Sequence, residues 1–281
     1  MHRRWVGWLL LSAFTIVVGS ERANAQGLPA DFVAVYQPAI EGLRKIYSQG
    51  TLKGTLSDEY GDGRSISRRF TLWLAGRTSR IDAKVTGQKG MGAAVNGTDI
   101  YMAMPGASML AYRNGKGALA NRPMDEDSYG QAKNSIGELC PISFPYTMGT
   151  QGTILSMLQR SDVKITNFKR GKVDGEPMIK IDYEALVGPD GRQGPWTCSL
   201  RLSPNEGYAL RSYTCTAGHG NQQITLSGSL SYTMSIHDEP LLAEMVRSER
   251  RGSQLVERHT VNISDYQTQA PPSFQFSADA F

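Results

Sequence analysis

The sequence has 281 residues, of which 40% are hydrophobic and 20% are charged, and its formal net charge is +4 at pH 7. This length suits one large domain rich in β-strands, or two halves that share a sheet. The basic residues are scattered along the chain rather than gathered in runs, so the small positive charge does not indicate a nucleic-acid-binding protein.

The first 25 residues have the pattern of a secretory signal peptide. Residues 2–4 form a short basic region, residues 5–18 are almost wholly apolar, and residues 23–25, Ala-Asn-Ala, form a small-x-small cleavage site. The apolar run is shorter than the roughly 18–20 residues that a membrane-spanning helix needs, so an uncleaved anchor is the weaker alternative. Cleavage after Ala25 removes three arginines and one glutamate and leaves a formal charge of +2. We expect a periplasmic or secreted protein with a single domain over residues 26–281.

Residues 31–48 have the clearest helical pattern, because their apolar residues recur at three- and four-residue steps and form one stripe. This stripe consists of Phe32, Val35, Tyr36, Ala39, Leu43, Ile46 and Tyr47. Asp31 is a suitable N-cap and Gly50 a suitable stop, whereas Pro38 predicts a kink or a delayed start near Gln37. We expect this helix to cover one face of a sheet.

Residues 51–117 consist of short extended stretches separated by glycine turns. The first strand is expected at 51–60, and further stretches follow at 66–74, 81–85, 91–95, 100–104 and 110–112. One face of the second stretch consists of Ile66, Arg68, Phe70, Leu72 and Leu74. Period-two alternation broken by Asn-Gly and other glycine turns predicts an antiparallel meander with one apolar face.

After residue 117 the alternation fades. Residues 118–152 contain three prolines, several glycines and the acidic residues 125–127, and we interpret them as a long connecting loop with a short helical turn at 128–133. Long loops in compact domains are often functional lids, and a packed structural connector is the alternative.

The strand pattern returns after a short helix predicted over residues 153–159. Strands are expected at 163–168, 178–183, 196–202, 208–215, 222–236 and 255–266. Residues 241–249 fit a strand or a helix, and we favour a strand. The tail, 271–281, carries three phenylalanines and is expected to dock on the body. The predicted fold class is mainly β (α+β): a large curved antiparallel sheet, or half-open barrel, with the long N-terminal helix and the short helix on its concave side.

Two of the three cysteines are predicted to form a disulfide. Cys198 and Cys215 lie on either side of a turn at residues 203–207, so in a hairpin their sulfur atoms can face each other. Two unpaired core thiols are the alternative. Cys140 is left over, and we interpret it as a buried small residue because no histidine lies near it in the sequence.

The sequence contains no G-x-S-x-G elbow, no metal-ligand spacing, no phosphate loop and no dinucleotide fingerprint. His219, His237 and His259 are isolated, and we interpret them as surface or hydrogen-bonded histidines. We therefore assign no catalytic residue, metal or cofactor and expect a protein that is not an enzyme. A hydrolase stays as a third hypothesis with little support from the residues.

Three local motifs are similar to those of one known superfamily. Residues 70–74, followed by Arg80-Ile81-Asp82, resemble its paired second and third strands, and residues 95–102 resemble its V-x-G-x-x hairpin. Residues 174–181 resemble the strand that opens its second half. With the order of elements over residues 31–266, these motifs resemble the LolA/LolB-like superfamily of exported lipoprotein carriers, which includes RseB-type sensor domains and LppX-type lipid carriers.

This resemblance implies a half-open barrel that holds an acyl chain between its concave sheet and its helices. Apolar residues of the central strands would then line the groove, and methionine suits such an adaptable pocket. The expected ligand-binding residues are Ile66, Phe70, Leu72, Leu74, Ile81, Met102 and Met104.

The function implied by the resemblance is non-enzymatic binding of a lipid or lipoprotein acyl chain, with sorting of outer-membrane lipoproteins as a specific role. A membrane protein is a further candidate partner, nucleic acid is not expected, and the protein is expected to be a monomer. The alternative hypothesis is a periplasmic sensor or protein-interaction module whose core is filled.

Overall fold

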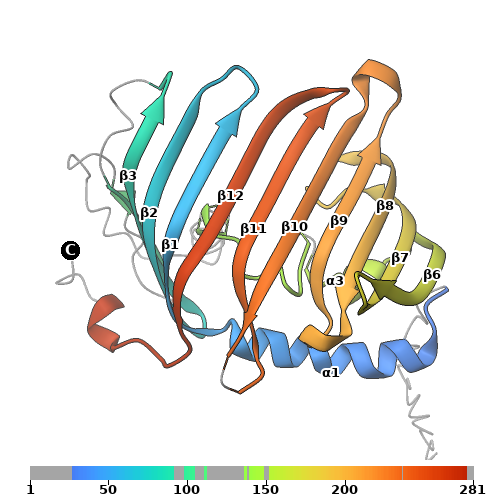
Figure 1. The fold of residues 1–281 in the computed structure, drawn as a ribbon, viewed down its shortest axis with the longest axis horizontal. Helices are drawn as coiled ribbons and strands as arrows, with labels where there is room; N and C mark the ends of the chain where they lie inside the picture. The colour runs from blue at the N-terminus through green and yellow to red at the C-terminus, as the bar shows by residue number, and fades with distance from the viewer. Residues whose placement is uncertain are drawn as a thin grey trace, which may run out of the picture.

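The fold is a single curved antiparallel sheet. The protein was analysed as a computed structural model, which describes residues 27–91, 98–104, 111–112, 136–137, 139–148, 152–235 and 237–276. Twelve strands in this part of the chain form one sheet in the order β5-β4-β3-β2-β1-β12-β11-β10-β9-β8-β7-β6 (Figure 1). The sheet is not closed into a barrel, because β5 and β6 form its two edges. The predicted fold class is therefore confirmed, whereas the predicted signal peptide lies outside the described residues.

The strands lie where the alternating pattern predicts them. The first half of the chain contains β1 (Gln49–Tyr60), β2 (Ser65–Ala75), β3 (Thr78–Lys89), β4 (Thr98–Ala103) and β5 (Ala111–Tyr112). The second half contains β6 (Val163–Val173), β7 (Glu176–Val187), β8 (Gln193–Ser203), β9 (Ala209–Ala217), β10 (Ile224–Met234), β11 (Pro240–Arg251) and β12 (Gln254–Gln267). Residues 240–251 are thus a strand, as favoured, and the stretch predicted at 91–95 lies almost wholly outside the described residues.

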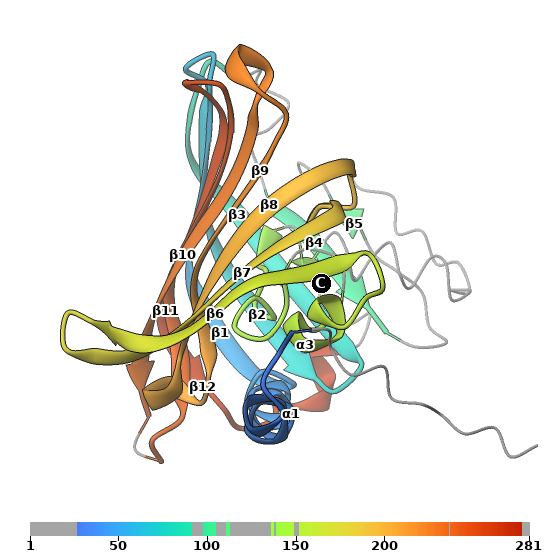
Figure 2. The same ribbon diagram turned by 90° about the vertical axis from the view of Figure 1, so that its right-hand side faces the viewer.

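The predicted long helix is α1 (Ala30–Ile46), which crosses the strands at one end of the concave side (Figures 1 and 2). Its stripe buries Phe32, Tyr36, Ile40 and Leu43. Two details of the prediction are wrong. The N-cap position is Pro29 rather than Asp31, and the helix continues through Pro38 without a delayed start. The apolar stripe on both sides of Pro38 stabilises the helix there, since most helix stability in proteins comes from packing.

Short segments fill the concave side of the sheet. The short helix α3 (Ile154–Leu158) lies there, close to its predicted bounds, and Thr153 caps it by accepting a hydrogen bond from the Ser156 amide (Figure 2). The described part of the long connector packs beside it. Ile136, Cys140, Phe144 and Met148 are at most 4% exposed. This part is therefore a packed connector and Cys140 is buried as predicted, whereas residues 118–135, with the acidic run and the predicted helical turn, lie outside the described residues.

The C-terminal tail docks through its backbone. After β12, the 3-10 helix η4 (Ser273–Phe276) lies beside β3, and the buried Arg80 donates a hydrogen bond to the Gln275 carbonyl oxygen at 3.0 Å. Phe274 is 60% exposed, so this phenylalanine does not anchor the tail in the way that we expected. Phe276 is half-buried, and residues 277–281 lie outside the described residues. No helix in the described part of the chain is long and apolar enough to cross a membrane.

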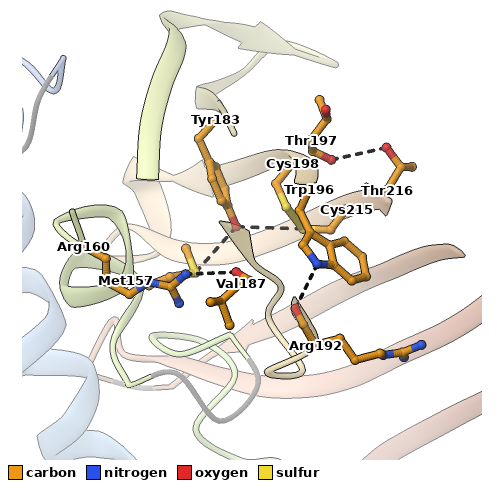
Figure 3. Close-up of a disulfide and its surroundings, with 10 residues drawn as sticks. All are labelled: Met157, Arg160, Tyr183, Val187, Arg192, Trp196, Thr197, Cys198, Cys215 and Thr216. Carbon is orange, nitrogen blue, oxygen red and sulfur yellow. Dashed lines mark hydrogen bonds between the residues drawn. A yellow bond between two sulfur atoms is a disulfide. The ribbon is translucent and has the colours of Figure 1, made fainter. Parts of the chain in front are cut away.

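The predicted disulfide joins Cys198 and Cys215 across β8 and β9, where the two residues are direct partners (Figure 3). Both cysteines are at most 2% exposed. Tyr183 of β7 lies beside the bridge, and its hydroxyl donates a hydrogen bond to the Met157 sulfur at 3.6 Å. The bridge therefore joins two neighbouring strands, and Tyr183 beside it links β7 to α3.

Removing the disulfide should destabilise the fold. Because the bridge closes a loop of 17 residues, the double variant Cys198→Ala/Cys215→Ala is expected to lose about 3 kcal/mol of unfolding free energy. Urea denaturation of the wild type and the variant measures the loss. A reducing agent should lower the wild-type midpoint and leave that of the variant unchanged. Equal midpoints for the two oxidised proteins would contradict the prediction.

Gly54 of β1 lies where the neighbouring strands β12 and β2 leave no room for a side chain. A Cβ atom at this position would lie 1.9 Å from the Asn262 carbonyl oxygen of β12 and 2.9 Å from the Phe70 ring of β2. Gly54→Ala is therefore expected to lower the unfolding free energy by about 1–3 kcal/mol through overpacking. Gly87 of β3 has open space around its Cβ position, so Gly87→Ala is the matched control and should change stability by less than about 1 kcal/mol. Calorimetry of both variants tests this difference.

Candidate functional site

The candidate site is a pocket of about 570 Å³ on the concave face of the sheet. Its floor consists of alternate residues of β1, β12 and β11, because residues paired across neighbouring strands share a face. The apolar and aromatic part of its lining consists of Tyr60, Tyr101, Leu139, Phe144, Tyr213 and Leu226. The charged part consists of Asp58, Arg68, Asp190, Arg192, Arg247, Glu249, Glu257 and His259. The pocket is therefore amphipathic.

A buried charged cluster lies at the centre of the floor. Asp58 and His259 are direct partners across β1 and β12, and the Asp58 Oδ1 atom lies 2.5 Å from the His259 Nδ1 atom. Arg68 of β2 donates to the Asp58 Oδ2 atom at 2.7 Å, and its Nε atom lies 3.8 Å from an Asp99 oxygen. Burial alone would raise the pKa of Asp58, but the hydrogen bonds and positive charge from His259 and Arg68 outweigh it and hold this pKa below its usual range.

A turn between β7 and β8 supplies the opposite wall. The Trp196 indole donates a hydrogen bond to the Arg192 carbonyl oxygen at 3.1 Å, and the ring packs so closely on Gly188 that a Cβ atom there would clash at 2.5 Å. This packing directs the turn toward the pocket. The Arg192 guanidinium then reaches across to β11, where it donates to both oxygens of Glu249 at 3.1 and 2.6 Å, and it also pairs with Asp190.

Arg247 of β11 has a different environment from the other two arginines. Its guanidinium lies over the Phe144 ring, 5.8 Å from the ring centroid, and no carboxylate in the described residues is within ion-pair distance of it. Phe144 in turn packs against Tyr213, with ring centroids 6.0 Å apart. Burial raises the pKa of Tyr213 to about 12, so its phenol stays protonated at neutral pH and can donate a hydrogen bond.

The predicted ligand-binding residues do not form one groove. Five of them lie on the concave face and are at most 8% exposed, namely Ile66, Phe70, Leu72, Leu74 and Ile81. Ile81 is the direct partner of Leu72 and so shares its face, whereas Met102 is the partner of Arg80 and lies on the other face. Met104 follows β4 and is half-buried. None of the seven lines the pocket, and their role in ligand binding stays a prediction.

Sequence reasoning missed the charged floor of the pocket. The signal that was available is a charged residue at an inward position of an alternating apolar strand, as for Arg68 between Ile66 and Phe70. His219 and His237 are exposed, in accord with their interpretation as surface residues. His259 is only 4% exposed, and its contact with Asp58 joins positions 201 residues apart, which no local pattern reveals.

The site can bind a ligand with charged and apolar parts. A histidine oriented by a carboxylate can also act as a general base, but such catalysis needs a nucleophile or a substrate proton within hydrogen-bond reach. Within the described residues, the His259 Nε2 atom has no hydrogen-bond partner, and no cluster of side chains could hold a metal ion.

Replacing Asp58 should reveal the strength of the buried cluster. Asp58→Asn is expected to lower the unfolding free energy by about 3 kcal/mol at pH 7, because the buried Arg68 loses its nearest carboxylate. The pKa of Asp58 is lower in the folded than in the unfolded protein, so its stabilisation is present above about pH 4 and is lost as the pH falls through the folded pKa. The difference in urea midpoints should therefore shrink as the pH is lowered.

The neighbouring residue is a matched control for this substitution. Glu59 lies on the same strand and forms an exposed ion pair with Arg258 at 3.2 Å. Glu59→Gln should therefore cost less than about 1 kcal/mol. Equal losses for the two variants, or a loss for Asp58→Asn that does not change with pH, would contradict the assigned role of the cluster.

Known proteins that are similar to this chain were found among solved structures. No protein-family model and no curated protein matches the sequence. Among solved structures, the chain is similar to a LolA superfamily protein from Nitrosomonas europaea, with 10% sequence identity, a TM-score of 0.46, and coverage of 88% of this chain and 99% of that one.

Two further solved structures match less closely. An uncharacterized conserved protein from Thermus thermophilus has 9% identity and a TM-score of 0.34, with coverage of 85% of this chain and 91% of that one. A chain of the MucA/MucB complex from Pseudomonas aeruginosa has 12% identity and a TM-score of 0.16, with coverage of 80% of this chain and 94% of that one. At these identities the likeness describes the fold alone.

Proposed function

We propose that the protein is an exported, non-enzymatic binding protein that holds a lipid or another acyl-chain amphiphile on the concave face of its sheet. The observation that carries this proposal is the amphipathic pocket beside the packed core. Its volume of about 570 Å³ falls within the range of small-molecule binding sites, about 300–1,000 Å³.

The apolar part of the pocket provides the driving force for binding. Leu139, Phe144 and Leu226 line it together with three tyrosines, so an acyl chain placed there would leave water. Each buried methylene group contributes about 0.8 kcal/mol, and a segment of six methylenes therefore about 5 kcal/mol before the cost of ordering the chain. This contribution is enough for a specific but reversible complex.

The predicted groove residues do not line the pocket in which we propose that the ligand binds. Phe70, Leu72 and Ile81 belong to the same packed cluster as the connector residues Phe144 and Met148. All three are at most 1% exposed, so an acyl chain could contact them only by displacing the side chains packed on them. We therefore place the ligand in the pocket itself and propose deeper insertion only as an extension of the same site.

Export agrees with the disulfide. A bridge between buried cysteines persists in an oxidising compartment such as the periplasm or the extracellular space. The predicted leader sequence at residues 1–25 would direct the chain there. Sorting of outer-membrane lipoproteins is the specific role that we propose for a periplasmic carrier of this kind.

A second candidate function is a sensor or protein-interaction module, with a membrane protein as its partner. The observation that favours it is the filled core, because the five predicted groove residues on the concave face are at most 8% exposed. In that case the pocket would be a surface feature without a lipid ligand.

Ligand binding can be tested with a neutral apolar dye. The mature protein, purified without detergent, is expected to bind N-phenyl-1-naphthylamine in the pocket and to carry lipid in native mass spectrometry. Leu139→Glu places a charge in the apolar wall and should weaken dye binding at least tenfold, about 1.4 kcal/mol.

A neighbouring connector residue supplies the control. Ile142 is also half-buried and packs against the core, but it does not line the pocket, so Ile142→Glu should leave dye binding unchanged while both variants keep their melting temperature within a few degrees of each other. Protein without lipid that also fails to bind the dye would exclude the carrier proposal and favour the interaction module.

A further inference from the structure

The charged floor of the pocket contains a row of three paired residues. Asp58 of β1, His259 of β12 and Arg247 of β11 are successive cross-strand partners, so all three side chains project from the concave face. All three line the pocket. The row therefore brings one acidic and two basic side chains to a single level of the sheet.

His259 carries an unused hydrogen-bonding atom. Its Nδ1 atom faces Asp58 at 2.5 Å, whereas its Nε2 atom is buried and has no partner among the described residues. The residue is 4% exposed. A buried polar atom without a partner is unfavourable, and a ligand atom that bonds to it removes this cost. Because Nδ1 faces Asp58, Nε2 is the ring nitrogen that remains for a ligand, and it donates a hydrogen bond to an anionic group when it carries a proton.

Arg247 is the arginine of the pocket that is left for a ligand. Arg68 pairs with Asp58, and Arg192 pairs with Asp190 and Glu249, whereas no carboxylate in the described part of the chain pairs with Arg247. Its contact with the Phe144 ring holds the guanidinium beside the apolar wall. Guanidinium groups bind carboxylates and phosphates through two parallel hydrogen bonds.

We propose that Arg247 and His259 form the subsite for the anionic head group of an amphiphile whose apolar part lies against Leu139, Phe144 and Leu226. This inference rests on the proposed function, because it names the head group of the same ligand. Glu257 of β12 also lines the pocket and forms no ion pair within the described residues, so it opposes a second negative charge. The site therefore favours a head group with a single charge, such as a carboxylate.

Three soluble probes separate the contributions of head and chain. Dodecanoate, 1-dodecanol and acetate are titrated against the mature protein loaded with N-phenyl-1-naphthylamine, and displacement of the dye is measured. Dodecanoate should displace it at a concentration at least tenfold lower than 1-dodecanol, since only the carboxylate accepts charge-assisted hydrogen bonds from the subsite, and acetate alone should not displace it.

Variants identify the subsite. Arg247→Gln should remove the tenfold preference for dodecanoate over 1-dodecanol, while Arg247→Lys should retain most of the preference. Arg251 lies on the same strand, is exposed and does not line the pocket, so Arg251→Gln is the control and should behave as the wild type.

The outcomes distinguish this inference from the proposed function. Equal displacement by dodecanoate and 1-dodecanol would overturn the anionic subsite and leave the amphiphile-binding proposal intact. Displacement by neither long-chain probe would overturn both. Displacement by acetate at the same concentration as dodecanoate would show a site for free anions and would also overturn the proposed head-group subsite.

Discussion

The pairing of β1 with β12 is the constraint on which the rest of the structure depends. Elsewhere in the sheet, adjacent strands also follow each other in the chain, but this ladder joins positions as far apart as Thr51 and Gln267. Forming it closes a very long loop, and the entropy cost rises only slowly with loop length. The ladder unites two meanders into one curved sheet and brings Asp58 beside His259.

The buried cluster gives that ladder a strong preference for one register. A shift of one residue in β12 would turn every side chain to the opposite face, so His259 would leave the concave side and Val261 would no longer pack in the core. Such a shift would leave Asp58 with Arg68 alone in a buried site. Charged groups on the inner face therefore serve the assembly of the fold and, at the same time, form the floor of the pocket.

The filling of the concave side decides where space remains on the sheet. The connector and α3 contribute apolar side chains to the same packed core as four of the predicted groove residues, Phe70, Leu72, Leu74 and Ile81. Asp58, His259 and Arg247 lie on β1, β12 and β11 of the same sheet. Phe144 and the turn between β7 and β8 cover them only in part. The space that remains is therefore amphipathic rather than purely apolar, in agreement with the amphiphile that we propose as its ligand.

The sequence by itself determined the local structure. Period-two alternation placed the strands, the stripe from Phe32 to Leu43 placed α1, and the positions of Cys198 and Cys215 around one turn predicted their bridge. It could not place the site, because register between distant strands depends on packing over the whole sheet. The tertiary structure decided that Met102 faces away from Leu72 and that Asp58, His259 and Arg247 meet, since contacts 12 to 201 residues apart leave no periodic signal in the chain.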